Sequence, residues 1–316
     1  MDKNSVAQIV SPETQRVRPA RHGLMHVLML LATACWAANI VAVKEALRGF
    51  APLALVQLRV MGAGLLFVVL FRAWPRRPAL TRDQLRPGTL VVLALSGVAF
   101  NQLFFVGGVA RTSVAHTGLL VALGPVMVLV LACLLRLEAL TVLKFVGMLV
   151  SFGGVAVLTM RRAGQGTGDY WIGDLIVLAG SAVFAIYTIQ LKKVARLYDA
   201  ISLNTLTYGI GALFLLPFGA RPALASHWSA LTTPMGLAVA YIIVFGSVIP
   251  YTIYAFAITE LAASRIAAFS YLQPVIATGL GIWLLSEKLT VRVVVGGTLI
   301  LLGVYLTERE RGEERT

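Results

Sequence analysis

Long apolar stretches alternate with short polar ones from residue 24 to residue 307 of the chain. A helix needs about 20 apolar residues to cross the hydrocarbon core of a bilayer, and fewer where it is broken. Ten stretches fit this length to within a few residues, and each predicts a membrane-spanning helix. Their limits are 24–43, 52–71, 88–110, 114–135, 142–160, 172–191, 201–219, 234–258, 263–285 and 292–307.

The ten stretches divide into two sets of five because the chain contains one pattern twice. Shifted by 149 residues, the stretch 125–155 falls on 274–304, and residues too rare to match by abundance coincide. The matched pairs are Pro125 with Pro274, Glu138 with Glu287, Thr141 with Thr290, Gly147 with Gly296 and Gly154 with Gly303. Upstream the match continues with Gly97 over Gly246, Phe105 over Tyr254 and, at an offset of 148, Trp36 over Phe184 and Lys44 over Lys192. An internal repeat predicts two similar halves; two apolar segments of convergent composition are the alternative explanation.

The repeat also predicts how the halves are oriented. An odd number of spans in each half gives the two halves opposite orientations, related by a pseudo-two-fold axis in the membrane plane. The predicted fold is an all-α polytopic membrane protein with ten transmembrane helices arranged as two inverted five-helix repeats. The expected segments are a tail at 1–23, a first repeat at 24–160, a linker at 161–171, a second repeat at 172–307 and a tail at 308–316.

Composition and charge agree with a membrane location. The chain is 58% hydrophobic and 13% charged, which is unlike a soluble domain. Its net charge of +13 comes from short basic clusters between apolar runs, so a nucleic-acid-binding face is not expected. With the amino terminus inside, 18 Lys and Arg residues fall on the inner side and 8 on the outer side, and Arg59 lies within a span. Both termini are therefore expected in the cytoplasm, and the first span is expected to be retained.

The motifs of enzymes and metal sites are absent from the sequence. It contains no HExxH, Walker A or GxSxG motif, and its two cysteines, Cys35 and Cys133, lie in separate apolar runs. We therefore expect no catalytic residue, no cofactor and no metal. A small-molecule substrate and the lipid bilayer are the expected partners, and a monomer is compatible with the pattern. A channel or a lipid-translocating helper is an alternative that the same ten spans could form.

Polar and aromatic side chains within the spans predict a substrate cavity between the halves. Rings and neutral hydrogen-bonding groups suit an uncharged or zwitterionic metabolite. A charge within a span needs a partner, and for Arg59 we expect Glu45 or an anionic group of the substrate. Helix packing and interhelical hydrogen bonds are the alternative roles. The candidate substrate-binding residues are Trp36, Asn39, Arg59, Asn101, Phe105, Tyr187, Tyr251, Tyr254, Tyr271 and Gln273.

Prolines within the spans are candidate hinges, because proline bends a helix and frees a backbone carbonyl. Pro125, Pro250 and Pro274 are the three, with a plain kink as the alternative. His116, near the outer end of the fourth span, is a candidate proton site because histidine changes charge near neutral pH. All fourteen acidic residues fall in tails, loops or span ends. A cavity without a carboxylate is expected to bind cations poorly, which favours a facilitator or a weakly coupled exporter of neutral or zwitterionic metabolites.

Several of these residues together resemble a known family. They are Trp36-Ala37-Ala38-Asn39, Lys44, Pro52, Arg59, Asn101, Gly107, Pro125, Glu138, Gly147 and Gly153-Gly154, with Pro274, Glu287, Gly296 and Gly303 in the second half. Over residues 24–307 the pattern is similar to the EamA family of the drug/metabolite transporter superfamily. The resemblance implies a bacterial inner-membrane exporter with two inverted five-helix repeats, working by alternating access, and a central cavity lined by spans 1, 3, 4, 6, 8 and 9.

The resemblance also bears on the substrate. Members of the YddG kind export amino acids, whereas others handle sugars, drugs or other metabolites. Neutral or zwitterionic amino acids are the expected substrates, and drugs, sugars, nucleosides and organic cations are the alternatives.

Overall fold

The computed structural model describes residues 19–73, 87–136, 140–159, 170–195, 197–261, 266, 269 and 272–313. Residues 1–18 of the predicted amino-terminal tail, most of the linker, Glu138 and Tyr271 lie outside the described residues, whereas residues 19–23 already belong to the first helix. The described elements are α1 (Pro19–Ala46), α2 (Pro52–Ala73), α3 (Pro87–Leu93), η2 (Ala94–Ala99), α4 (Phe100–Val109), α5 (Val114–Val121), α6 (Gly124–Leu134), α7 (Val142–Thr159), α8 (Tyr170–Val194), α9 (Ala200–Leu224), η3 (Trp228–Ala230), α10 (Thr233–Ile243), η4 (Val244–Val248), α11 (Ile249–Glu260), α13 (Leu272–Leu285) and α14 (Val291–Glu313).

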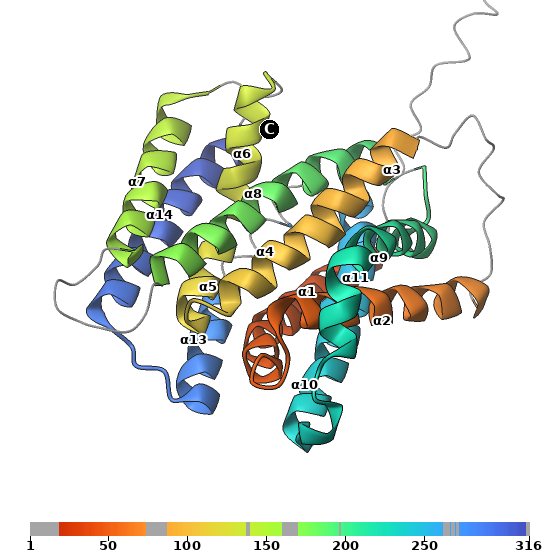
Figure 1. Cartoon of the computed structure of the whole chain (residues 1–316). Helices are drawn as coiled ribbons and strands as arrows, with labels where there is room; N and C mark the ends of the chain where they lie inside the picture. Colours follow the sequence, from red (N-terminus) through yellow and green to blue (C-terminus); the bar gives the residue numbers. More distant parts are fainter. Residues whose placement is uncertain are drawn as a thin grey trace, which may run out of the picture.

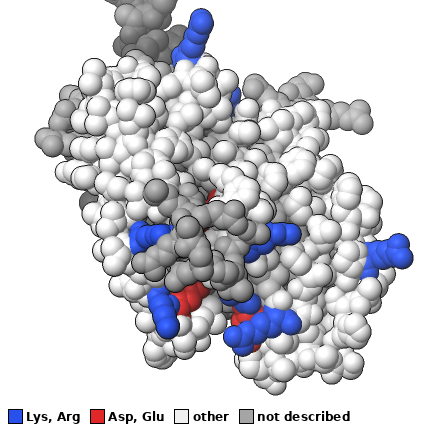
Figure 2. All heavy atoms as spheres, turned by 60° about the vertical axis from the view of Figure 1, so that its left-hand side comes forward, with Lys and Arg blue, Asp and Glu red and all other residues white. Residues whose placement is uncertain are grey.

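Seven helical runs in the described part of the chain are long and apolar enough to cross a membrane. They are Gly23–Ala46, Pro52–Ala73, Pro87–Val109, Val114–Leu134, Tyr170–Val194, Ala200–Leu224 and Thr233–Glu260. Three shorter apolar helices, Val142–Leu158, Leu272–Leu285 and Val291–Leu306, fall on the remaining predicted spans. The face in Figure 2 carries few charged side chains, most of them in the lower half of the view. The predicted class, a helical multi-pass membrane protein, is confirmed.

Local chemistry sets where several helices begin and break. Pro52 opens α2, a position where its missing N–H is not needed. Asp199 and Ser113 cap α9 and α5, each accepting a hydrogen bond from a backbone N–H three residues later. Pro125 follows directly on Gly124, where α6 begins, so the fourth predicted span is divided into α5 and α6. The cause is that proline cannot donate the hydrogen bond that would continue α5.

The helices pack in pairs that each join the first half to the second. α7 lies beside α14 on one side of the molecule, and α2 lies beside α9 on the other (Figure 1). Between these pairs α4 runs along α8, and α1 packs against α10, α11 and α13. The interface between the halves therefore runs through the middle of the helix bundle.

Two spans contain a π-helical turn at equivalent positions of the repeat. η2 includes Gly97, and η4 includes Gly246, which lies 149 residues later. A π turn disturbs the regular ladder and leaves a carbonyl for another partner. The Gly97 carbonyl accepts a hydrogen bond from the Tyr251 hydroxyl at 2.9 Å, and the Gly246 carbonyl accepts one from Arg59 Nη2 at 2.7 Å. Each π turn is thus bonded by a side chain of the other half.

The contact between α7 and α14 recurs when both of its members are shifted by 149 residues. A Cβ built on Gly154 would lie 2.7 Å from the Gly296 carbonyl oxygen, and one built on Gly303 would meet the Gly147 carbonyl oxygen. Gly303 is the repeat equivalent of Gly154, and Gly147 is the repeat equivalent of Gly296. The two contacts are therefore equivalent to each other under the repeat. Only glycine permits backbones to approach this closely.

Some residues bond directly to their own repeat equivalents. Gln102 Nε2 donates to the Tyr251 hydroxyl at 3.1 Å, and these residues are 149 positions apart. Ser151 Oγ donates to the carbonyl of Ile300 at 3.3 Å across the same separation. Such contacts arise where two similar units meet face to face. The halves therefore meet each other through equivalent surfaces.

Candidate functional site

A cavity of about 170 Å³ lies between the two halves. α1, α4, α5, α6, α8, α11 and α13 contribute to its wall, together with Arg59 from α2. Helices of the six predicted cavity-lining spans thus all reach it. The predicted site residues found in the wall are Trp36, Asn39, Arg59, Asn101, Phe105, Tyr251, Tyr254 and Gln273, with the predicted hinge Pro125.

The other predicted residues lie elsewhere. Tyr187 is behind the wall, with its ring against Gly97 and 6.0 Å from the ring of Tyr251. Pro250 is buried at the start of α11, directly after η4, and Pro274 is buried in α13. In this conformation none of these three side chains lines the cavity. Tyr271 lies outside the described residues.

Aromatic rings from both halves form one side of the cavity. The Trp36 ring stands edge-on to the rings of Phe184 and Tyr251, at centroid distances of 6.3 and 6.0 Å. Tyr254 lies 5.7 Å from both Trp36 and Phe184, and its hydroxyl is 3.1 Å from Thr188 Oγ1. These spacings suit edge-to-face attraction between rings. The sequence reasoning omitted Phe184, although it is the repeat equivalent of Trp36 and could have been found from that match.

Arg59 is the only charged residue in the described lining, and its side chain is bonded by the second half. Its Nε donates to Ser247 Oγ at 2.9 Å, its Nη2 donates to the Gly246 carbonyl, and its guanidinium carbon is 5.7 Å from the Phe105 ring centroid. The expected pairing with Glu45 is wrong. Glu45 is at the end of α1 and pairs with Arg48, three residues later, at 3.1 Å.

A second set of hydrogen bonds joins α4 of the first half to α8 and α11 of the second half. The Tyr251 hydroxyl accepts from Gln102 Nε2 and donates to the Gly97 carbonyl or, at 3.3 Å, to Asn101 Oδ1. Asn101 Nδ2 donates to the Gly180 carbonyl at 3.2 Å. Neutral polar groups are therefore fixed beside the rings at the same part of the wall.

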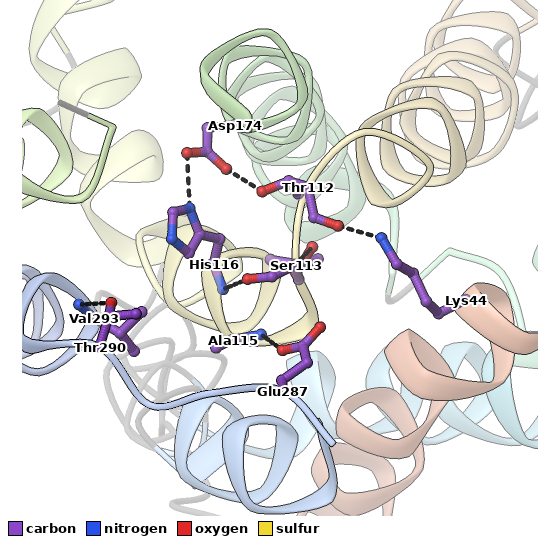
Figure 3. A network of polar contacts seen from close by, with 10 residues as sticks. Lys44, Thr112, Ser113, Ala115, His116, Asp174, Glu287, Thr290 and Val293 are labelled. Atoms are coloured by element: carbon purple, nitrogen blue, oxygen red, sulfur yellow. Dashed lines mark hydrogen bonds and ion pairs between the residues drawn. The ribbon is translucent and has the colours of Figure 1, made fainter. Parts of the chain in front are cut away.

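A separate group of polar contacts lies at the end of α1 that carries Lys44 (Figure 3). We call Lys44, Thr112, His116, Asp174 and Glu287 the Lys44 network. The Lys44 ammonium donates to the backbone carbonyls of Val109, at 2.9 Å, and Thr112. Asp174 is buried at the start of α8; its carboxylate accepts from the Thr112 hydroxyl and lies 2.9 Å from His116 Nδ1.

Asp174 links the second half to the first half through Thr112 and His116, and Glu287 provides a second link. Its carboxylate oxygens accept from the backbone N–H groups of Val114, at 2.8 Å, and Ala115, at 3.2 Å. The preceding residue, Ser286, has a φ of 55°, a left-handed conformation at the end of α13 that turns the chain back. The first turn of α5 favours a negative charge, so Glu287 stabilises contact between the halves at this end.

Apolar helices thus surround a cavity between the halves, and polar links join the halves at one end. Residues 23–160 and 171–309 each match the model of the EamA-like transporter family. The chain therefore belongs to this family, whose members are multi-pass membrane transporters.

Individual relatives agree with this assignment. An uncharacterized transporter of Archaeoglobus fulgidus is 26% identical over 90% of this chain and 99% of its own length. A protein of Streptantibioticus cattleyicolor described as a "probable terminal-alkyne amino-acid exporter" is 26% identical over 89% of this chain and 92% of its own length. A solved crystal structure aligns with a TM-score of 0.62 at 18% identity, over 93% of this chain and 99% of that one, and shows the same fold.

Proposed function

We propose that this protein exports small neutral or zwitterionic metabolites, amino acids first, across a bacterial inner membrane by alternating access. The cavity between the halves carries the proposal. Its volume of about 170 Å³ is below the roughly 300–1,000 Å³ of sites for drug-sized ligands, which favours a small substrate. Its wall offers aromatic rings and neutral hydrogen-bonding groups from both halves.

The proposed topology has ten spans, two inverted repeats and both termini in the cytoplasm. The contacts that recur under the 149-residue shift support a two-fold relation between the halves. The excess of Lys and Arg in the loops assigned to the inner side supports the orientation. Cysteines placed at 80 and 165 should then react with a membrane-impermeant reagent from opposite sides. Labelling of both from one side would contradict the topology.

The proposed transport cycle opens the cavity to the two sides of the membrane in turn. The Lys44 network supports one part of this cycle, because the bonds of Asp174 and Glu287 to the first half must break before the halves separate at that end. The break between α5 and α6 at Pro125 lies in the cavity wall and supplies a place for bending.

The charged groups in the described cavity lining favour neutral or zwitterionic substrates over cations, because Arg59 is positive and no lining residue is negative. The described lining holds no carboxylate, so nothing there would offset the desolvation of a lipophilic cation. The naming of the Streptantibioticus relative as an amino-acid exporter adds support for amino acids.

Transport by purified protein in proteoliposomes tests the proposal. We expect saturable flux of labelled amino acids, and weak flux of sugars and cationic dyes, with little change when a pH gradient is imposed. Tyr254→Ala and Asn101→Ala should reduce this flux while leaving membrane abundance intact. Leu213→Ala, at a side chain that is 72% exposed on α9, is the matched control. Strong cation transport driven by the pH gradient would overturn the proposal.

A further inference from the structure

Three side chains in the cavity wall have a buried polar atom without a hydrogen-bond partner. The atoms are Arg59 Nη1, Asn39 Oδ1 and Gln102 Oε1, and each residue is 2% exposed. Such atoms are uncommon in folded proteins, because an unpaired buried polar group is unfavourable by as much as a lost hydrogen bond. Where such atoms belong to residues that line a cavity, a ligand can supply the missing partner.

Arg59 differs from other unpaired groups because it carries a charge. Gln57, Asn204 and Tyr208 also have unpaired buried atoms, but they are neutral and lie outside the cavity lining. Within the described part of the chain, Arg59 forms no ion pair with a carboxylate. Its hydrogen-bond partners, Ser247 and the Gly246 carbonyl, are neutral. A buried cation with neutral partners strongly favours the arrival of an anionic group.

One unpaired acceptor lies near the guanidinium, and the other belongs to a side chain that is bonded to the aromatic side of the cavity. The Asn39 amide and Arg59 Nη2 both border Gly246: a Cβ there would overlap Asn39 Oδ1 and lie 3.3 Å from Nη2. Gln102 is bonded to Tyr251, whose ring is 6.0 Å from that of Trp36. The cavity wall thus offers a guanidinium donor, two amide oxygens and aromatic rings.

We infer that Arg59 selects substrates that carry a carboxylate, and that Asn39 and Gln102 accept hydrogen bonds from the ammonium group of the same molecule. A guanidinium binds a carboxylate through strong, charge-assisted hydrogen bonds, and ring faces attract an ammonium. The inference rests on the proposed transport function and deepens it by naming the charges that the substrate must carry.

The rest of the cavity defines the remainder of the substrate. Met29 lies ten residues before Asn39 on α1, or about 15 Å along the helix, and Val128, Ile258 and Ile266 line the cavity with it. An apolar side chain fits this end. The three unpaired atoms have almost no exposed surface in this conformation. A carboxylate would therefore reach Arg59 only after side chains of the wall shift, and the Phe105 ring, 5.7 Å from the guanidinium carbon, is one of those beside it.

Competition in proteoliposomes tests the carboxylate requirement directly. Leucine, valine and phenylalanine would each be offered beside the corresponding amide and the corresponding decarboxylated amine, against uptake of the labelled amino acid. We expect the amides and amines to compete at least about tenfold more weakly, because a hydrogen bond between charged groups is lost. The unfolding temperature of the wild type, and of the variants described next, would be measured on the same samples to separate loss of binding from loss of folding.

Three variants assign the effect to Arg59. Arg59→Gln should abolish the preference for the carboxylate, and Arg59→Lys should retain part of it because the charge remains. Asn39→Asp should also abolish the preference while raising the unfolding temperature, because the new carboxylate pairs with the guanidinium from within the protein. Asn204→Asp is the matched control, a buried amide outside the cavity, and should leave the preference unchanged.

The outcomes separate this inference from the proposed function. Absence of saturable flux for every amino acid tested would overturn the proposed function, and with it the inference. Saturable amino-acid flux in which the amides compete equally well would overturn the role of Arg59 alone. If the preference for the carboxylate persists in both Arg59→Gln and Asn39→Asp, the role of Arg59 is likewise overturned. Should Arg59→Gln fail to fold, Asn39→Asp decides the question.

Discussion

Replacing Glu287 with glutamine removes one negative charge from the contact between the halves while keeping the size of the side chain. The carboxylate accepts hydrogen bonds from the N–H groups of Val114 and Ala115, the first two residues of α5. Glutamine still offers one carbonyl oxygen, but it carries no charge for the helix terminus. Glu287→Gln should therefore weaken the closed arrangement at this end without creating a cavity.

The size of the effect follows from the two hydrogen bonds. A hydrogen bond to a charged group contributes about 1.5–3 kcal/mol, against about 0.5–1.5 kcal/mol for a neutral one. Losing the charge beside the α5 terminus is worth about 0.3–1 kcal/mol and is part of the same difference. Glu287 is partly exposed, so water offsets part of the loss at both bonds. We expect a net loss of about 1–2 kcal/mol, so the ratio of closed to open molecules should fall about five- to thirtyfold.

Thiol labelling from the Lys44 side of the membrane measures this ratio. The reporter is Ser181→Cys, a small change in the cavity wall, in a chain whose two cysteines are replaced by Cys35→Ala and Cys133→Ala. Glu287→Gln should raise the labelling rate by the same five- to thirtyfold, because the rate follows the open population. The unfolding temperature is recorded to exclude general loosening.

Glu45→Gln is the matched control for this experiment. Glu45 also lies next to Lys44, but its ion pair among the described residues is with Arg48, a partly exposed pair at the end of α1, where such pairs contribute about 0–1 kcal/mol. Its loss breaks no contact between the halves. An unchanged labelling rate in Glu287→Gln, or an equal increase in Glu45→Gln, would refute the role of Glu287 in closing this end.

Two further predictions concern helix packing and proton coupling. Gly154→Ala should lower the unfolding temperature because its Cβ would meet the backbone of α14, whereas Gly153→Ala, with nothing within 4 Å of the new Cβ, should not; equal effects on thermal unfolding would contradict the packing. His116→Gln and Asp174→Asn should each leave amino-acid flux as insensitive to an imposed pH gradient as in the wild type, because the pair holds the halves together and carries no proton. Loss of a pH response present in the wild type would instead assign the proton to this pair.

The sequence predicted the seven long apolar helices because the relevant physics is local. The length of an apolar run sets whether a helix can cross a bilayer, and the repeat places Gly154 and Gly303 at equivalent points. The break at Pro125 is also a local effect of the missing N–H. These features need no knowledge of which segments meet.

The partners of the polar groups could not be predicted in the same way. Arg59 bonds to Ser247 and Gly246, and Glu287 bonds to the start of α5, across separations of more than 170 residues. Those contacts depend on how the two halves pack together. The contact of Arg59 also depends on the π turn η4, which the residue pattern does not predict. Tyr187 shows a related difficulty. Its ring packs against Gly97 instead of lining the cavity, and the spacing of aromatic residues along the sequence does not give the orientation of α8 in the bundle.

The bonds between repeat equivalents have a consequence for how a substrate would be oriented. Exchanging the halves would replace Asn39 with Tyr187, Arg59 with Tyr208 and Gln102 with Tyr251, because these residues occupy equivalent positions. The three unpaired polar groups of the cavity wall thus belong to the first half alone. A molecule held by them would keep its direction relative to the first half whichever side of the membrane were open. The family pattern occurs twice in the chain, but these three polar groups occur once, so such a molecule would have a single preferred orientation in the cavity.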